Sequence, residues 1–89
     1  MNEKHSSNAL TIYRGISEGA NKYGLSWTLD RDKAIWFARR DSHRGRPVLL
    51  TACAKKYDVH ALLLRRNESE IVIDKFEITA TEYVSTIGE

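Results

Sequence analysis

The clearest structural signal in the chain lies in residues 24–40, GLSWTLDRDKAIWFARR. Residues 25–28 form a short extended stretch that leads directly into a helical pattern. Asp30 is a good helix N-cap, and Asp32 suits the positive N-terminal end of a helix. We therefore predict a helix over residues 30–40 that packs on a sheet through one apolar face, formed by Ala34, Phe37 and Ala38.

On the N-terminal side of this stretch, residues 9–13 (ALTIY) predict a strand. They are rich in β-branched and aromatic residues, and the strand is expected to end at Gly15. Residues 16–24 contain serine, asparagine and glycine, which is typical of a loop. Residues 1–7 are polar and predict a flexible tail, so residues 8–89 are expected to form a single domain.

On the C-terminal side, Gly45 and Pro47 end the helix and predict a loop over residues 41–46. Residues 47–54 (PVLLTACA) are apolar at both alternating sets of positions, as in a central strand covered on both faces. Residues 58–64 fit a strand or a helical turn equally well, whereas residues 71–73 and 76–85 predict further strands. The expected fold class is α+β: a small mixed, mainly antiparallel twisted sheet with one principal helix.

Composition limits the classes of function. The chain has 89 residues, 42% hydrophobic and 29% charged, with a net charge of +2, so we expect a thin core and no global field that attracts nucleic acid. The chain has a single cysteine, Cys53, so it cannot form an internal disulfide. We expect this cysteine to be buried. We expect a cytoplasmic protein, because there is no membrane-length apolar run and no signal peptide. The three histidines have no ligand spacing, so we expect no metal site.

Two glutamates, Glu68 and Glu70, directly precede the strand predicted over residues 71–73. Residues two apart in a strand point to the same face, so both carboxylates would project together. Neighbouring carboxylates repel, and one of them can keep its proton to a higher pH. This pair suits a general base or a ribose-binding site, and the alternative is two solvated acids at an exposed strand end.

Two further motifs carry groups that suit a phosphate or sugar ligand. Arg14 lies between Tyr13 and Gly15; its guanidinium matches phosphate oxygens, and the glycine allows a ligand close to the backbone. Ser26 and Thr28 lie two apart, just before the helix. Each motif also has a structural explanation. Arg14 could form a surface salt bridge, and the Ser26–Thr28 motif could be a strand that ends in a capping hydroxyl beside a core tryptophan.

The order of these motifs resembles that of the ADP-ribosyltransferase superfamily: Tyr13-Arg14-Gly15, then Ser26-Trp27-Thr28 before a helix, then Glu68-Ser69-Glu70. The resemblance covers about residues 13–73 and implies that the chain uses NAD as its substrate. It implies that Arg14 and Gly15 bind phosphate and that Ser26 and Thr28 form the ribose strand. It further implies that Glu70 stabilises an oxocarbenium ion, that Glu68 orients the acceptor, and that Trp27 or Tyr23 stacks on nicotinamide.

The resulting prediction is an NAD-dependent ADP-ribosyltransferase or NAD glycohydrolase that acts on a cellular macromolecule, with a protein or a nucleic acid as acceptor. The alternative is a non-catalytic binding protein on the same scaffold, such as a phage or mobile-element inhibitor of a host defence complex. A third interpretation is a nucleic-acid-binding accessory protein that uses the basic residues 39–46, which otherwise form a solvated loop. No membrane partner is expected, and an unpaired edge strand would support a homodimer.

Overall fold

The computed structural model describes residues 8–20, 24–40, 42–65 and 68–85. In this part of the chain a six-stranded sheet is accompanied by one α-helix, and short 3₁₀ turns occupy Ser42–Arg44 and Lys56–Asp58. The elements follow in the order β1 (Ala9–Ser17), β2 (Ser26–Thr28), α1 (Arg31–Arg40), β3 (Pro47–Lys55), β4 (Val59–Arg65), β5 (Glu68–Ile73) and β6 (Phe76–Tyr83).

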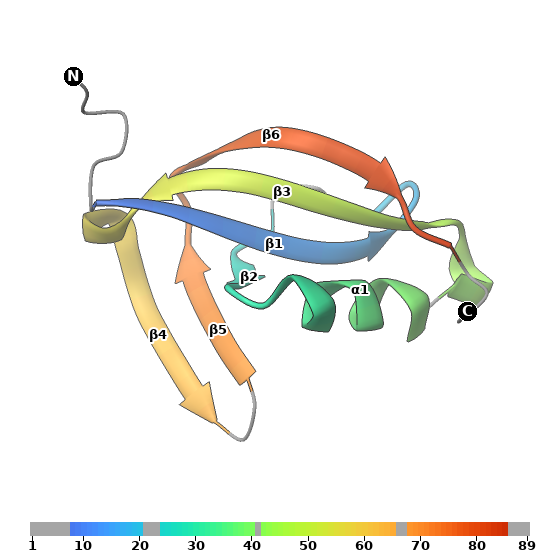
Figure 1. Ribbon diagram of the computed structural model, residues 1–89, viewed down its shortest axis with the longest axis horizontal. Helices are drawn as coiled ribbons and strands as arrows, with labels where there is room; N and C mark the ends of the chain where they lie inside the picture. Colours follow the sequence, from blue (N-terminus) through green and yellow to red (C-terminus); the bar gives the residue numbers. More distant parts are fainter. Residues whose placement is uncertain (1–7, 21–23, 41, 66–67, 86–89) are drawn as a thin grey trace.

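The strands are ordered β4-β5-β2-β1-β3-β6 across the sheet. All five described strand pairings are antiparallel, so the α+β class is confirmed, while the prediction of a mixed sheet is wrong. Figure 1 shows β1, β3 and β6 running along the molecule above α1, with β4 and β5 steeply inclined to them. One recorded pair, Tyr13↔Thr28, joins β1 to β2, and so connects a β4-β5-β2 half to a β1-β3-β6 half.

The long central strands differ from their predicted bounds. β1 does not end at Gly15 but continues to Ser17, because it pairs with β3 without interruption from Ala9↔Lys55 to Ser17↔Pro47. The loop predicted from residue 16 therefore begins later. Residues 58–64, left open between strand and helix, lie mostly in β4, which pairs with β5 along its length. In both places pairing with a distant strand determines the backbone conformation.

One face of the sheet carries the main hydrophobic core. It combines residues of β1 and β3 with residues of the other half, namely Trp27, Ile71 and Ile73. Trp27 lies on β2 and Phe76 on β6, with β1 and β3 between these strands, yet their ring centroids are 4.7 Å apart. The sheet is therefore folded over itself, and the core lies between its two halves.

The other face of the sheet is partly covered by α1. Asp30 caps the helix, since its Oδ1 accepts a hydrogen bond from the backbone N–H of Lys33 at 3.2 Å. Ala34 and Ala38 are fully buried as predicted, whereas Phe37 is only half-buried and lines a cavity at the edge of the helix. Small residues at the contact allow the helix backbone to lie directly on the sheet.

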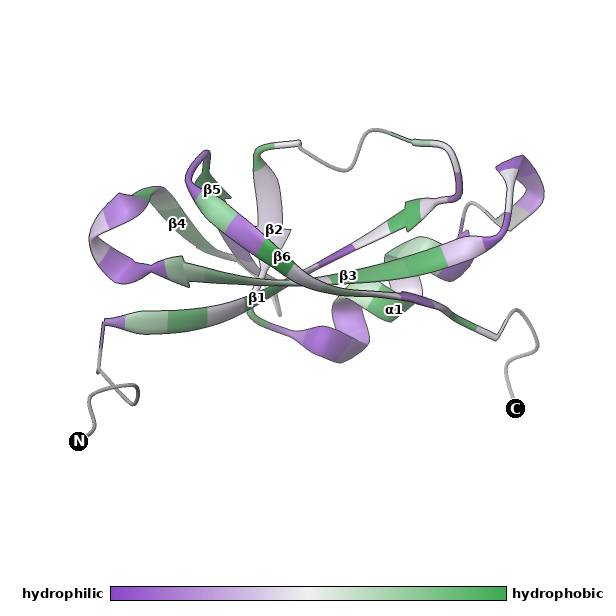
Figure 2. Ribbon diagram, turned by 90° about the horizontal axis from the view of Figure 1, so that it is seen from above, coloured by the Kyte–Doolittle hydropathy of each residue, from purple (hydrophilic) through white to green (hydrophobic). Residues whose placement is uncertain are grey.

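β3 is covered on both faces only in its first half. Its residues from Pro47 to Leu50 are all buried, and Figure 2 shows β3 mainly in the hydrophobic colour, followed by a hydrophilic turn. Further along, the strand extends beyond the part of the sheet that α1 covers (Figure 1). Cys53 lies there and is exposed, so its predicted burial is wrong.

Candidate active site

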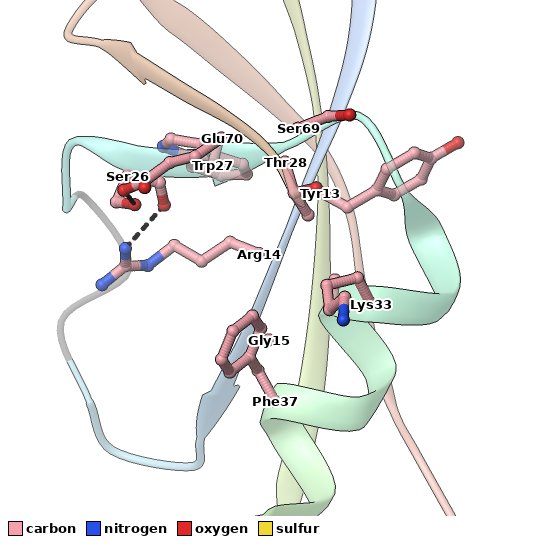
Figure 3. A pocket seen from close by; sticks show the side chains of 11 residues that line it. Tyr13, Arg14, Gly15, Ser26, Trp27, Thr28, Lys33, Phe37, Ser69 and Glu70 are labelled. Atoms are coloured by element: carbon pink, nitrogen blue, oxygen red, sulfur yellow. Dashed lines mark hydrogen bonds between the residues drawn. The ribbon is translucent and has the colours of Figure 1, made fainter. Parts of the chain in front are cut away.

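The candidate site begins where β1 and β2 separate. Beyond the Tyr13↔Thr28 pair, the side chain of Arg14 extends from β1 toward β2 (Figure 3). Its Nη1 donates a hydrogen bond to the backbone carbonyl of Ser26 at 2.9 Å. Its Nε is buried and has no hydrogen-bond partner among the described residues, an arrangement that costs free energy unless a ligand supplies an acceptor.

A serine and a carboxylate meet on the other side of this separation. Thr28 pairs with Glu70, and Ser26 with Val72, so the side chains of Ser26, Thr28 and Glu70 share one face of the β2-β5 pair. The hydroxyl of Ser26 donates a 2.5 Å hydrogen bond to Oε2 of Glu70. This short bond orients the half-buried carboxylate.

These residues line a single cavity of about 190 Å³, shown in Figure 3. Three strands and one helix contribute to its wall. Residues as far apart in the sequence as Tyr13 and Glu70 therefore meet there. The lining residues are Tyr13, Arg14, Gly15, Ser26, Trp27, Thr28, Lys33, Ala34, Phe37, Ser69 and Glu70.

The site brings opposite charges together. Arg14 and Lys33 are the cations among the lining residues, and Glu70 is the carboxylate. Burial lowers the pKa of the Arg14 guanidinium, although an arginine stays protonated at neutral pH. The cavity therefore offers fixed positive charge for an anionic group beside a carboxylate that could stabilise a developing cation.

The structure assigns different roles to three of the predicted binding residues. The side chain of Trp27 is 2% exposed, packs on Phe76 and donates its indole N–H to the carbonyl of Gly24 at 2.9 Å. It packs in the core and also borders the cavity, so its predicted role of stacking on a ligand stays a prediction. Thr28 is 9% exposed, and its hydroxyl accepts a hydrogen bond from the backbone N–H of Asp30. Gly15 lies against α1, where the helix backbone leaves no room for a side chain.

Two of the predicted residues can be described only in part or not at all. Glu68 is the first residue of β5 and pairs with Arg65, but its side chain lies outside the described part of the structure. Tyr23, the other candidate for stacking, also lies outside the described residues.

The helix contributes residues that sequence reasoning missed. Lys33 and Phe37 lie one turn apart on α1 and line the cavity, as does Tyr13 on β1, whose ring points away from Arg14 and Ser26 (Figure 3). Lys33 and Phe37 are four residues apart, a spacing that places two side chains on the same face of a helix. It was not usable from the sequence alone, because Phe37 also fits the apolar face that includes Ala34 and Ala38.

Three comparisons bear on identity. The chain matches no protein-family model, no curated protein and no solved structure. The resemblance to ADP-ribosyltransferases thus stays a prediction, and function has to be argued from the site itself. Among the described residues, no group of histidine, cysteine and acidic side chains could hold a metal ion. No helix in that part of the chain has the length and apolar character needed to cross a membrane.

Proposed function

We propose that this chain binds NAD and cleaves its nicotinamide–ribose bond, either transferring ADP-ribose to an acceptor or releasing it to water. The observation that supports this proposal is the convergence of Arg14, Ser26 and Glu70, from three different strands, on one cavity. The three motifs are up to 56 residues apart in the chain (14 to 70), and a purely structural origin does not require them to meet.

Each residue has a physical role in this reaction. The guanidinium of Arg14 binds an anionic phosphate, and its Nε, which has no partner in the described part of the chain, is an available donor. Ser26 holds Glu70 in place through their hydrogen bond. As the glycosidic bond breaks, nicotinamide leaves with the bonding electron pair, and the Glu70 carboxylate stabilises the positive charge on the ribose. A hydroxyl group of water or of the acceptor then forms the new bond at the same carbon and loses its proton to solvent.

The size of the cavity limits how NAD would bind. Sites that enclose a drug-sized ligand typically have volumes of roughly 300–1,000 Å³. At about 190 Å³, this cavity would enclose only one end of a dinucleotide. We assign it to nicotinamide and its ribose, since Glu70 lies there. Phe37 and Tyr13, which line the cavity, join Trp27 as the candidates for aromatic contact with the ligand.

Replacement of Glu70 by glutamine tests the proposal. Glu70→Gln keeps the size of the side chain and removes its charge, and loss of such electrostatic stabilisation typically lowers rates by about 10²–10³-fold. We expect the variant to fold and bind NAD but to release nicotinamide more slowly by this factor. Glu77→Gln, on exposed β6, is the matched control and should behave as the wild type. Wild-type nicotinamide release by Glu70→Gln would contradict the mechanism.

The small cavity also favours a second candidate, a non-catalytic binding protein for a host protein complex. In that case titration with NAD up to millimolar concentrations would show no binding, and Glu70→Gln would leave affinity for the partner unchanged. The basic residues within 39–46 would form the contact instead. Replacing Arg44 and Arg46 by glutamate would then weaken the complex in a salt-dependent way. The NAD titration separates the two candidates directly.

A further inference from the structure

Helix α1 carries an exposed tryptophan that the fold does not use. Trp36 has an exposed fraction of 54%, whereas Ala34 and Ala38 on the sheet side are fully buried. At about 100° per residue, Trp36 projects roughly opposite to these alanines. An exposed aromatic ring on a helix offers a face on which a ligand can stack.

The ring is surrounded by cations and a second aromatic side chain. The Nζ of Lys33 lies 5.7 Å from the centroid of the Trp36 ring, and the Cζ of Arg40 lies 5.4 Å from it. The Phe37 ring lies 5.1 Å from the Trp36 ring at an interplanar angle of 76°, and Arg40 also lies over Phe37. We refer to Lys33, Trp36, Phe37 and Arg40 as the helix platform.

The other two cations of α1 have structural partners. Arg31 lies 4.0 Å from a carboxylate oxygen of Glu82 on β6, and the Nε of Arg39 donates to the carbonyl of Ser85 at 2.8 Å. These contacts attach the opposite flank of the helix to the C-terminal part of the chain. Lys33 and Arg40 lie on the other flank of the helix, beside the Trp36 ring.

The helix platform adjoins the candidate site. Lys33 and Phe37 belong to the platform and also line the cavity that contains Arg14 and Glu70. A ligand that lies on the platform would therefore reach the mouth of the cavity. This continuity favours a partner that is used together with the site.

We infer that the helix platform binds single-stranded nucleic acid, with a base stacked on Trp36 and the neighbouring phosphates at Lys33 and Arg40. Stacking of bases on aromatic rings, combined with cations along the backbone, is the usual mode of binding to single strands. A duplex keeps its bases stacked on one another and offers no free face to the ring. An acidic peptide would pair with the cations but leave the indole without a partner. That this strand is the ADP-ribose acceptor rests on the proposed function.

Binding to labelled 12-nucleotide strands of DNA and RNA, measured by fluorescence anisotropy without NAD, tests the inference. We expect Trp36→Ala to weaken binding by about 5- to 150-fold, the range for loss of one stacked base, and Trp36→Phe to restore much of it. Arg40→Glu should weaken binding most at low salt. The matched controls are exposed residues remote in the fold, Tyr57→Ala and Lys55→Glu, and they should bind as the wild type.

The probes discriminate between partners. A preference for DNA or for RNA would identify the source of the strand, and either supports the inference. Equal or tighter binding of the matching duplex, or of a 12-residue acidic peptide, would overturn it. Absence of single-strand binding at about 50 mM salt, where phosphate contacts are strong, would also overturn it.

Tryptophan fluorescence supplies a second readout. The chain contains two tryptophans, and Trp27 is 2% exposed, so quenching by an added oligonucleotide should come from Trp36. Quenching that persists in Trp36→Phe would contradict stacking at this position.

Failure of this inference can be told from failure of the proposed function. Glu70→Gln should bind the single strand as the wild type does, because Glu70 is not part of the platform. Trp36→Ala should release nicotinamide from NAD at the wild-type rate. A wild-type protein that releases nicotinamide but binds no single strand would overturn only the docking surface. A wild-type protein that binds the strand but releases no nicotinamide would overturn only the NAD chemistry.

Discussion

Gly15 shows how one residue can be required for the fold beside the site. A Cβ atom at this position would lie 1.8 Å from the carbonyl oxygen of Ala34 and 2.7 Å from the N of Ala38, both in the backbone of α1. Neither atom can move without displacing the helix. At the residue scale, the glycine therefore sets how closely α1 approaches β1, and with it the position of Lys33 and Phe37.

We predict that Gly15→Ala lowers the free energy of unfolding by about 1–3 kcal/mol, the usual cost of overpacking. Gly24→Ala is the matched control, because its Cβ would meet only the end of the flexible Arg14 side chain. That variant should stay within about 0.5 kcal/mol of the wild type, although Arg14 would shift. Urea denaturation measures both, and equal losses in the two variants would contradict a rigid contact at Gly15.

At the scale of elements, the N-terminus of α1 is held by a local turn. The Thr28 hydroxyl accepts a hydrogen bond from the N–H of Asp30, and Oδ1 of Asp30 accepts one from the N–H of Lys33. These bonds join β2 to α1 without a long loop. Ser26, on β2, and Lys33, on α1, are thereby kept on two walls of the same cavity.

We predict that Asp30→Ala destabilises the protein by about 1 kcal/mol, because the cap is lost. For a chain of this length that corresponds to a decrease in Tm of about 4–8 °C in a thermal scan. Asp30→Asn should retain most of the stability, since asparagine caps helices as well as aspartate does. An equal decrease in Tm for both variants would assign the effect to charge rather than to capping.

At the scale of the whole molecule, the two halves of the sheet are held together mainly by packing. One recorded strand pair joins β1 to β2, whereas Trp27 reaches across the folded sheet to Phe76 at 4.7 Å. The site lies beside this junction. The geometry of the site thus depends on Trp27, a core residue that supplies none of its charged or polar groups.

We predict that Trp27→Ala lowers the free energy of unfolding by about 3–5 kcal/mol, as is usual for truncation of a buried tryptophan. A loss of this size is a large fraction of the net stability of a small domain. Trp36→Ala, the same change at an exposed position, should cost about 0.5 kcal/mol or less. Chemical denaturation of both variants provides the measurement, and similar losses would contradict the core position of Trp27.

Local sequence was sufficient for the helix, and it singled out polar residues that the structure brings to one cavity. The cap at Asp30, the buried alanines and the bounds of α1 followed from contacts within a few residues, which a linear pattern records. Arg14, Ser26 and Glu70 were likewise identified from their types and neighbours. Long-range pairing was needed for the extension of β1 to Ser17, for the strand over residues 59–65 and for the antiparallel sheet, because such pairings connect residues that are far apart in the chain.

The tertiary structure alone determined which residues face the cavity and which face the core. Trp27 fitted a ligand-binding role in the sequence, but the fold of the sheet over itself places its ring against Phe76. Phe37 fitted the helix core, but Ala34 and Ala38 lie so close to β1 that it is left at the rim of the cavity. An aromatic residue packs equally well in a core or against a ligand, so its type does not reveal its role, and only the positions of distant strands do.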